Sequence, residues 1–361
     1  MRIGTVTEIK PDERRVGLTP ELVATLAARG HEVFVQSGAG AGIGRVDEAY
    51  AAAGAEILAD AAAVFEAAEI IVKVKEPQPV EIARLRPHHL LFTYLHLAPD
   101  PEQARGLMAS GATAIAYETI MDARHGLPLL TPMSQVAGRM AAQVGAQYLL
   151  APAGGRGLLM GGVPGVPPAR AVILGGGVAG FNAAEIALGM RADVTILDIS
   201  PARLAELDAL FEGRVRTVLS SRGAMLDLLP TADLIIGCVL VTGAAAPKLI
   251  LREDLARMRP GSVLVDVAID QGGCFETSRP TTHQDPIYVV DGVVHYCVAN
   301  MPGAAPLTST YALSAATAPY VLALADLGLD GAFAADPGFA AGLNVKAGRI
   351  AHPAVAAALG A

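Results

Sequence analysis

The chain has 361 residues, of which 52% are hydrophobic and 17% charged, and its formal net charge is -8. This composition is typical of a globular protein, and the length suffices for two domains that each have a core. The negative net charge argues against nucleic acid or an anionic membrane as the main partner.

The cysteines and the N-terminus bear on the cellular compartment. The three cysteines are Cys238, Cys274 and Cys297, which are widely spaced and form no C-x-x-C pair. They indicate reduced core thiols rather than a disulfide framework or a zinc site. The first residues enter a predicted strand directly, without a signal-peptide pattern, so we expect a cytoplasmic protein.

The first third of the chain predicts alternating strands and helices. Thr19 followed by Pro20 has the pattern of an N-cap with a proline in the first turn, which starts a helix. This alternation indicates a doubly wound α/β domain, in which functional side chains follow the carboxyl ends of the strands. Strands are expected at 2–7, 32–35, 70–74, 89–94 and 113–117, and helices from 20 onward and at 46–53 and 61–68.

The rest of the chain predicts a second α/β domain that is inserted into the first. After a long helix and a Gly/Pro-rich stretch, a new set of strands begins, and a last helix is expected to pack on the first domain. We therefore predict a split first domain, 1–130 with 305–361, and a nucleotide-binding domain, 131–304. The helices are expected at 134–150 and 309–327, the Gly/Pro stretch at 154–168, and the strands at 172–174, 194–197, 234–240, 263–268 and 288–290.

One uncharged stretch, 296–325, is long enough to cross a bilayer. It contains Pro302, Pro306 and Pro319 together with several serines and threonines. These residues do not suit the continuous apolar helix that a bilayer requires. A buried loop followed by a core helix is therefore the better prediction.

The strongest motif is a glycine turn between a predicted strand and a helix. Gly175, Gly177 and Gly180 match G-x-G-x-x-G. The first glycine makes the turn, the second lets the backbone approach a pyrophosphate, and the third lets helix and strand pack closely. Asp198 ends the next predicted strand, where an acid meets the adenosine ribose diol and would repel a 2′-phosphate. The motif predicts NAD rather than NADP, and a tight turn without a ligand is the alternative.

Polar residues near the ends of other strands suggest chemistry on a substrate. Lys75, His96 and Asp270 follow predicted strands, and Arg15 lies in a polar loop after the first strand. Each alone has an ordinary explanation: a solvated lysine, a hydrogen-bonded histidine, a helix N-cap or a surface charge. Together they supply two cations for a carboxylate, an imidazole and an acid, which suits hydride transfer on a small amino or oxo acid.

Segments in order along almost the whole chain resemble the alanine dehydrogenase family, which includes the NAD-binding part of proton-translocating transhydrogenase. The resemblance implies a substrate domain split by a Rossmann NAD-binding domain, and a homohexamer. It also implies that NAD and water convert L-alanine reversibly to pyruvate, ammonium and NADH. The matching segments are 13–20 (ERRVGLTP), 38–40 (GAG), 72–77 (VKVKEP), 92–97 (FTYLHL), 132–134 (PMS), 161–166 (GGVPGV), the glycine turn, 267–273 (VAIDQGG) and 298–303 (VANMPG).

The resemblance also implies roles for single residues. Arg15 and Lys75 would bind the substrate carboxylate and polarise the reacting group. His96 and Asp270 would exchange protons as a carbinolamine forms and breaks down, and which of them serves each step stays open. The cofactor would be bound by Ser134, Gly175, Gly177, Val178, Ala179, Gly180, Asp198, Arg203, Ser220, Val239, Leu240, Val267, Asp270, Arg279, Val298, Asn300 and Met301.

Two further expectations concern Arg203 and metal ions. Arg203 either contacts the adenosine end of the cofactor or lies on a helix surface. Some family members carry an acid and a histidine for magnesium late in the chain. The segment 321–325 has neither, so we expect no metal.

Three other functions fit the sequence less well. A soluble NAD-binding subunit of a transhydrogenase-like system would pass hydride to a partner subunit, but that relay needs no carboxylate clamp such as Lys75. A nucleotide-sensing protein without activity would not need four intact polar positions. Saccharopine dehydrogenases share the broad architecture, but their substrate needs a larger pocket. The breadth of amino-acid specificity and the physiological direction stay open.

Overall fold

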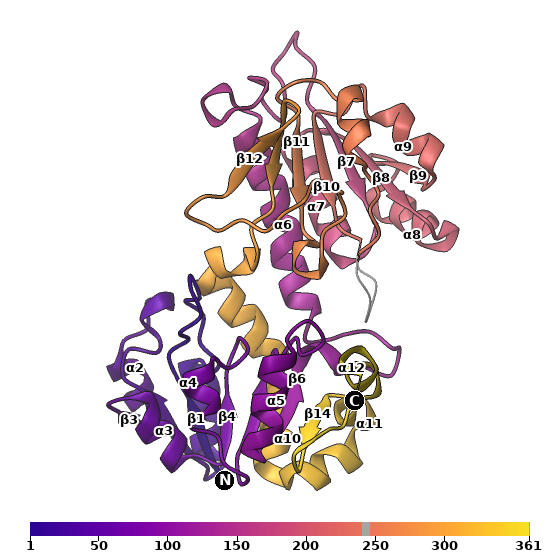
Figure 1. The fold of residues 1–361 in the computed structure, drawn as a ribbon. Helices are drawn as coiled ribbons and strands as arrows, with labels where there is room; N and C mark the ends of the chain where they lie inside the picture. The colour runs from indigo at the N-terminus through magenta and orange to yellow at the C-terminus, as the bar shows by residue number, and fades with distance from the viewer. Residues whose placement is uncertain (240–245, 361) are drawn as a thin grey trace. The chain divides into compact units, whose positions relative to one another are not determined.

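The computed structural model describes residues 1–239 and 246–360, and the chain divides into two compact α/β units (Figure 1). Unit 1 comprises Met1–Met133 and the residues from Gly303 onward, and unit 2 comprises Ser134–Pro302. The predicted fold class, with one doubly wound unit inserted into another, is confirmed.

Unit 1 contains an eight-stranded sheet with the order β15-β14-β6-β5-β4-β1-β2-β3. The strands β1 to β6 pair in parallel, whereas β14 and β15 add an antiparallel edge. The sequence prediction missed β3, β14 and β15. The strands are β1 Arg2–Thr5, β2 Glu32–Gln36, β3 Ala55–Leu58, β4 Ile70–Val72, β5 Leu90–Thr93, β6 Thr113–Ala116, β14 Leu343–Lys346 and β15 Arg349–Ile350.

Helices α1, α2 and α3 of unit 1 begin within one residue of their predicted starts, and α10 begins three residues before its predicted start, whereas α4, α5, α11 and α12 were not predicted. Thr19 caps α1, and its hydroxyl accepts the N–H of Leu22 at 3.4 Å. Asp60 and Asp100 cap α3 and α5 in the same way. The helices are α1 Pro20–Ala28, α2 Asp47–Ala52, α3 Ala61–Ala67, α4 Pro79–Ile82, α5 Pro101–Ser110, α10 Pro306–Ala335, α11 Pro337–Ala340 and α12 Pro353–Leu359, with short 3₁₀ turns η1 Ala41–Ile43 and η2 Tyr117–Thr119.

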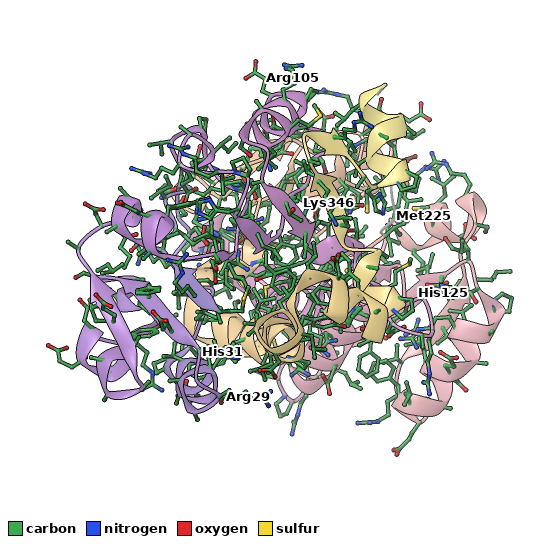
Figure 2. The ribbon with its side chains drawn as sticks, turned by 90° about the horizontal axis from the view of Figure 1, so that it is seen from below. Arg29, His31, Arg105, His125, Met225 and Lys346 are labelled. Carbon is green, nitrogen blue, oxygen red and sulfur yellow. The ribbon has the colours of Figure 1, made fainter. Side chains whose placement is uncertain are left out.

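Helix α10 is long and apolar enough to cross a membrane, by length and composition alone. In the structure it packs on α1, η1 and α11 within unit 1. The Thr310 hydroxyl accepts the backbone N–H of Val16 at 3.4 Å. Near its other end, Asp326 pairs with Arg29 and His31, which are labelled in Figure 2. These contacts tie α10 to unit 1, as the core-helix prediction expects.

Unit 2 contains a seven-stranded sheet with the order β12-β13-β11-β10-β7-β8-β9, in which only β12 is antiparallel. The chain changes direction across the sheet between β7 and β10, and ligands bind at such a switch point in open α/β sheets. The strands are β7 Arg170–Leu174, β8 Asp193–Asp198, β9 Arg216–Leu219, β10 Leu234–Gly237, β11 Val263–Asp266, β12 Ile287–Val290 and β13 Val293–Tyr296.

Both faces of the unit 2 sheet are covered. Ile173 and Ile236 pack on one face with the alanines of α7, whereas Val172 and Ile235 pack in a separate cluster on the other face. Burial on both faces explains why these strands are continuous apolar runs rather than alternating ones. The helices are α7 Val178–Gly189, α8 Pro201–Phe211 and α9 Arg222–Leu228, with 3₁₀ segments η3 Ala151–Ala153, η4 Arg252–Arg257 and η5 Ile269–Gln271. Helix α6 Thr131–Tyr148 and the 3₁₀ segment η6 Met301–Ala304 each include residues of both units.

Candidate active site and nucleotide-binding site

The turn between β7 and α7 has the backbone that the glycine motif predicts. Gly175 has a φ of 95°, which side-chain-bearing residues rarely adopt. A Cβ on Gly180 would lie 1.8 Å from the carbonyl oxygen of Gly175, so helix and strand approach too closely for any side chain. Gly177 is the N-cap of α7, and a Cβ there would meet no atom of residues 1–239 and 246–360 within 4 Å. Among these residues, nothing fills the space at the N-terminus of α7 where a phosphate would bind.

Asp198, at the end of β8, supports this turn. Its Oδ2 accepts the N–H of Gly176 at 2.7 Å, and its Oδ1 accepts the N–H of Ser200 at 2.9 Å. Each oxygen retains a second lone pair that can accept a hydroxyl. Arg203 donates from Nε to the carbonyl oxygen of Gly176 at 2.8 Å and pairs with Glu206. Arg203 thus contacts the glycine turn itself, and its contact with adenosine stays a prediction.

The other predicted cofactor residues of unit 2 lie mostly near the carboxyl ends of its strands. The N–H of Ser220, just after β9, donates to the carbonyl oxygen of Asp198 at 2.8 Å, and that of Val267 donates to Gly237 at 2.9 Å. The guanidinium of Arg279 lies 4.0 Å from the centre of the Tyr288 ring. Ser134 lies in α6, Val178 and Ala179 open α7, Val239 follows β10, Val298 and Asn300 follow β13, and Met301 opens η6. Leu240 lies outside the described residues.

Arg15 is buried in unit 1 beside a carboxylate. Its Nε and Nη2 donate to the two carboxylate oxygens of Glu13 at 2.7 and 2.5 Å, and its Nη1 lies 2.9 Å from the sulfur of Met133. Burial alone would lower the pKa of Arg15, but the hydrogen bonds and charge of Glu13 outweigh it and raise that pKa. A substrate carboxylate at Arg15 would share this cation with Glu13.

Lys75 lies three residues after the end of β4 and is 6% exposed. Its carbonyl oxygen accepts the hydroxyl of Thr93, from the neighbouring strand β5, at 2.9 Å. Burial alone would raise the pKa of Glu76, but the charges of Lys75 and Lys10 hold it below its usual value. The segment after β4 therefore carries a buried cation on a backbone that is anchored to β5.

His96 is held by its backbone in an unusual conformation. Its φ is 49°, in the left-handed region. The carboxylate of Glu118 accepts the N–H of His96 at 2.6 Å and the N–H of Leu95 at 3.2 Å, and lies 3.9 Å from His96 Nδ1. The imidazole stacks on the ring of Tyr94, with the centroids 5.8 Å apart. Glu118 thus holds the backbone of His96, while the 40% exposed imidazole lies against Tyr94.

The sequence prediction missed a buried ion cluster next to Lys75. Lys73 donates to Glu8 at 2.9 Å and to Glu81 at 2.7 Å, and Glu8 also accepts the N–H of Val74 at 2.6 Å. Burial raises the pKa of Glu8, although Lys73 opposes the shift. Burial alone would lower the pKa of Lys73, but the attraction of the two carboxylates raises it. A lysine inside the apolar run Ile70–Val74 is the sequence signal for such a cluster.

Asp270 lies on η5, beyond β11, rather than directly at the strand end, and its side chain is exposed. The sequence prediction missed Asp266, the buried last residue of β11. Burial raises the pKa of Asp266, and hydrogen bonds from Ser278 and Cys274 oppose the shift only in part. The sequence signal for Asp266 is an acid at the end of an apolar strand, four residues before Asp270.

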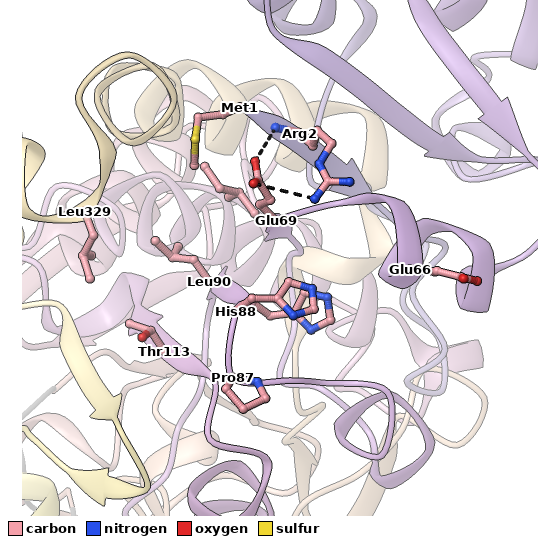
Figure 3. Close-up of a pocket in the computed structure, with 11 residues that line it drawn as sticks. Met1, Arg2, Glu66, Glu69, Pro87, His88, Leu90, Thr113 and Leu329 are labelled. Carbon is pink, nitrogen blue, oxygen red and sulfur yellow. Dashed lines mark hydrogen bonds and ion pairs between the residues drawn. The ribbon is translucent and has the colours of Figure 1, made fainter.

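Unit 1 also contains a pocket of about 540 Å³ that is lined by none of the predicted site residues described above (Figure 3). It is lined by residues at the amino ends of the parallel strands, such as Arg2, Leu90 and Thr113, and by His88. The backbone N–H of Arg2 donates to Glu69 at 3.0 Å. Ligands of open α/β sheets bind at the opposite, carboxyl ends of the strands. None of the predicted site residues lines this pocket, so it is not the candidate active site.

The glycine turn gives a prediction for unit 2. Gly180→Ala should lower the Tm and abolish nucleotide binding, because the added methyl group collides with the Gly175 carbonyl oxygen. Gly189→Ala, at the other end of α7, adds the same methyl group where nothing lies within 4 Å. It should keep nucleotide affinity and Tm, or raise Tm slightly. Thermal melts and NADH titrations of both variants check this, and normal affinity in Gly180→Ala would contradict the geometry.

Comparisons with known proteins find the same family along almost the whole length of the chain. The family model of the alanine dehydrogenase/PNT N-terminal domain matches residues 4–137, and that of the C-terminal domain matches residues 141–353. The chain is 58% identical to the alanine dehydrogenase of Halomonas elongata, covering 100% of this chain and 97% of that protein. It is 53% identical to the alanine dehydrogenase of Mycolicibacterium smegmatis, covering 99% and 96%.

Two solved structures extend this similarity. An L-alanine dehydrogenase superposes with a TM-score of 0.96 and 50% identity, over 100% of this chain and 99% of that chain. The transhydrogenase from Sinorhizobium meliloti superposes with a TM-score of 0.84 and 25% identity, over 97% and 100%. The chain therefore belongs to the alanine dehydrogenase/PNT family.

Proposed function

We propose that this chain catalyses the reversible oxidative deamination of L-alanine, in which L-alanine, NAD and water give pyruvate, ammonium and NADH. The observation that carries the proposal is 58% identity to an alanine dehydrogenase over the whole chain. The side chains that this chemistry needs are present in both units. The activity is that of an oxidoreductase acting on the CH–NH₂ group of its donor.

Unit 2 is proposed to bind NAD, which accepts the hydride from Cα of alanine when bound. The pyrophosphate would lie at the N-terminus of α7, and the ribose diol on Asp198. The open space at Gly177 and the second lone pairs of Asp198 fit this group. The other proposed cofactor residues are Ser134, Val178, Ala179, Arg203, Ser220, Val239, Leu240, Val267, Asp270, Arg279, Val298, Asn300 and Met301.

Unit 1 is proposed to bind the substrate. The planar edge of Arg15 suits a carboxylate, and the ammonium of Lys75 suits the carboxylate or the carbonyl oxygen of pyruvate. Both side chains are buried. The Lys75 ammonium therefore acts in a medium of lower dielectric constant than water, whereas the charge of Arg15 is shared with the carboxylate of Glu13.

His96 and Asp270 are proposed to move the protons. The ammonium group of L-alanine must first lose a proton. Loss of hydride from Cα then leaves an iminium ion, and the water that adds to this carbon gives up a second proton. Breakdown of the resulting carbinolamine takes the proton from its hydroxyl and adds one to the departing ammonia. An imidazole and a carboxylate can both serve as acid and base in such steps.

A soluble NAD-binding subunit of a transhydrogenase-like system is the alternative. The transhydrogenase structure is 25% identical to this chain, whereas the L-alanine dehydrogenase structure is 50% identical. A subunit that relays hydride between nucleotides needs no cationic site for a substrate carboxylate. Buried Arg15 and Lys75 therefore favour the dehydrogenase.

The proposal is tested by NADH formation from NAD with L-alanine, glycine, L-serine, L-2-aminobutyrate and D-alanine. We expect L-alanine to give the highest kcat/KM and D-alanine to give no turnover. The same panel measures the breadth of specificity. Binding of NADH without turnover of any amino acid would contradict the proposal and indicate a nucleotide-sensing protein.

Asp198 predicts the cofactor preference. Its carboxylate accepts hydroxyl groups but repels a 2′-phosphate, so kcat/KM should favour NAD over NADP by at least about tenfold, or roughly 1.4 kcal/mol. Initial rates with the two cofactors at saturating L-alanine measure this ratio. Equal use of both cofactors would show that Asp198 does not meet the ribose.

The proposed assembly and location follow the family resemblance and the composition. We propose a cytoplasmic homohexamer whose small-molecule partners are L-alanine or pyruvate and ammonium, with no nucleic acid or membrane partner. Light scattering should give about six times the subunit mass. A monomer would remove this proposal, and a dimer would favour the transhydrogenase-like alternative.

A further inference from the structure

Asp266 is a fully buried carboxylate that binds both arms of the loop carrying Asp270. Its Oδ1 accepts the backbone N–H of Ala268 at 3.1 Å, at the start of the loop. Its Oδ2 accepts the backbone N–H of Cys274 at 2.8 Å, at the end of the loop, and the hydroxyl of Ser278 at 2.5 Å. One side chain therefore closes this loop at its base.

The loop is built closely around this carboxylate. Gly272 and Gly273 have φ values of 89° and 77°, which turn the chain back toward β11. A Cβ on Gly273 would lie 2.5 Å from Oδ2 of Asp266. Asp270, on η5 between the two arms, is exposed. Its direction thus depends on how the two arms are held.

We propose that Asp266 is a positioning residue that sets the place of the Asp270 carboxylate and of the cofactor-binding backbone beside it. Its neighbour Val267 donates its N–H to Gly237 of β10 at 2.9 Å. Ser278, bound to the same carboxylate, directly precedes Arg279. The inference rests on the proposed acid/base role of Asp270 and on the proposed NAD contacts of Val267 and Arg279.

The substitution Asp266→Asn tests whether both carboxylate oxygens of Asp266 must accept hydrogen bonds. Asparagine keeps the size and one oxygen, but its NH₂ group cannot accept a hydrogen bond. Either the N–H of Ala268, or the donors of Cys274 and Ser278, would then face a donor in a buried place. The loop must shift to relieve this conflict, and a displacement of about 1 Å can cost roughly 10²-fold in rate.

Asp233→Asn is the matched control. Asp233 is 4% exposed and precedes β10, at the amino end of the same sheet, where it accepts the N–H of Arg170 at 3.0 Å and pairs with Arg156 and Arg259. Both variants should lower the Tm. Only Asp266→Asn should lower kcat, by about 10- to 10²-fold, and weaken NADH binding in a fluorescence titration. Equal effects of both variants on kcat and NADH affinity would overturn the proposal.

A double variant separates this inference from the proposed function. If Asp266 acts through Asp270, Asp266→Asn with Asp270→Asn should have the kcat of Asp270→Asn alone, within about threefold. A kcat lowered by the product of the two single effects would show that Asp266 does not act on turnover through Asp270, and would overturn its role in placing that carboxylate. Near-normal turnover of Asp270→Asn alone would instead overturn the acid/base role itself.

If Asp266→Asn does not fold, the milder variant Ser278→Ala tests the same proposal. It removes one donor to Oδ2 and leaves both backbone N–H contacts of the carboxylate in place. We expect a folded protein whose NADH affinity and kcat are both lower by about two- to fivefold. Unchanged NADH affinity and kcat in this variant would overturn the proposal.

Discussion

His96→Ala and Asp270→Asn are each expected to lower kcat by a factor of about 10² or more, the usual effect of removing a positioned acid/base group. NADH affinity should survive His96→Ala, because His96 belongs to unit 1 and the glycine turn to unit 2. Lys75→Ala should lower kcat/KM for both L-alanine and pyruvate, because the carboxylate is bound in each direction. Steady-state rates and NADH titrations measure these effects.

His125→Ala is the control for His96→Ala. His125 is an exposed histidine of unit 1 with a φ of 60° (labelled in Figure 2), so it shares the left-handed backbone of His96. Its replacement should leave kcat unchanged. Near-normal turnover of His96→Ala, with folding and NADH binding intact, would show that the imidazole is not an acid/base group.

Lys73→Met is expected to cause the largest loss of stability. It leaves the carboxylates of Glu8 and Glu81, each 2% exposed, without their cation. Breaking a buried ion pair in this way costs about 3–5 kcal/mol. For a unit of this size the Tm should fall by roughly 6 °C or more. Lys346→Met, at an exposed ion pair with Asp330 in the same unit, should change the Tm little.

The stability of Lys73→Met should also depend on pH. Burial raises the pKa of Glu8, and the ammonium of Lys73 opposes this rise. Without the ammonium, the pKa of Glu8 therefore rises further above its ordinary value. A carboxyl with a raised pKa in the folded state stabilises the fold at low pH and loses that contribution as pH rises through the shifted value. The Tm difference from the unsubstituted protein should be larger near about pH 8 than near about pH 5. A difference independent of pH would contradict the buried cluster.

Most interior strands could be predicted from the sequence, whereas the interior strand β13 and several strands at or near the sheet edges could not. Strands such as β10 and β11 are buried on both faces and stand out as apolar runs. The missed strands β3 and β9 lie at sheet edges and have mostly half-buried or exposed residues. Their weak pattern becomes a strand only through pairing with a neighbour. The two-residue strand β15 depends on β14 in the same way.

The sequence also predicted the polar groups that we propose as site residues better than the residues that hold them in place. Lys75 and His96 follow strands, where the fold rule places functional side chains. Their supporting residues act through distant contacts: Glu118 binds the N–H of His96 from 22 residues away. Glu13 lies close to Arg15 in sequence, but the role of its carboxylate depends on complete burial of the pair. Such partners become visible only once the chain has folded.

The reverse reaction tests the central claim most directly. The protein is incubated with NADH, pyruvate and ammonium, and the product is identified by chiral chromatography. We predict that NADH oxidation requires both pyruvate and ammonium and forms one L-alanine for each NADH consumed. Hydride transfer from NADH to a second nicotinamide nucleotide, without pyruvate and without formation of L-alanine, would contradict the claim and identify a transhydrogenase-like subunit.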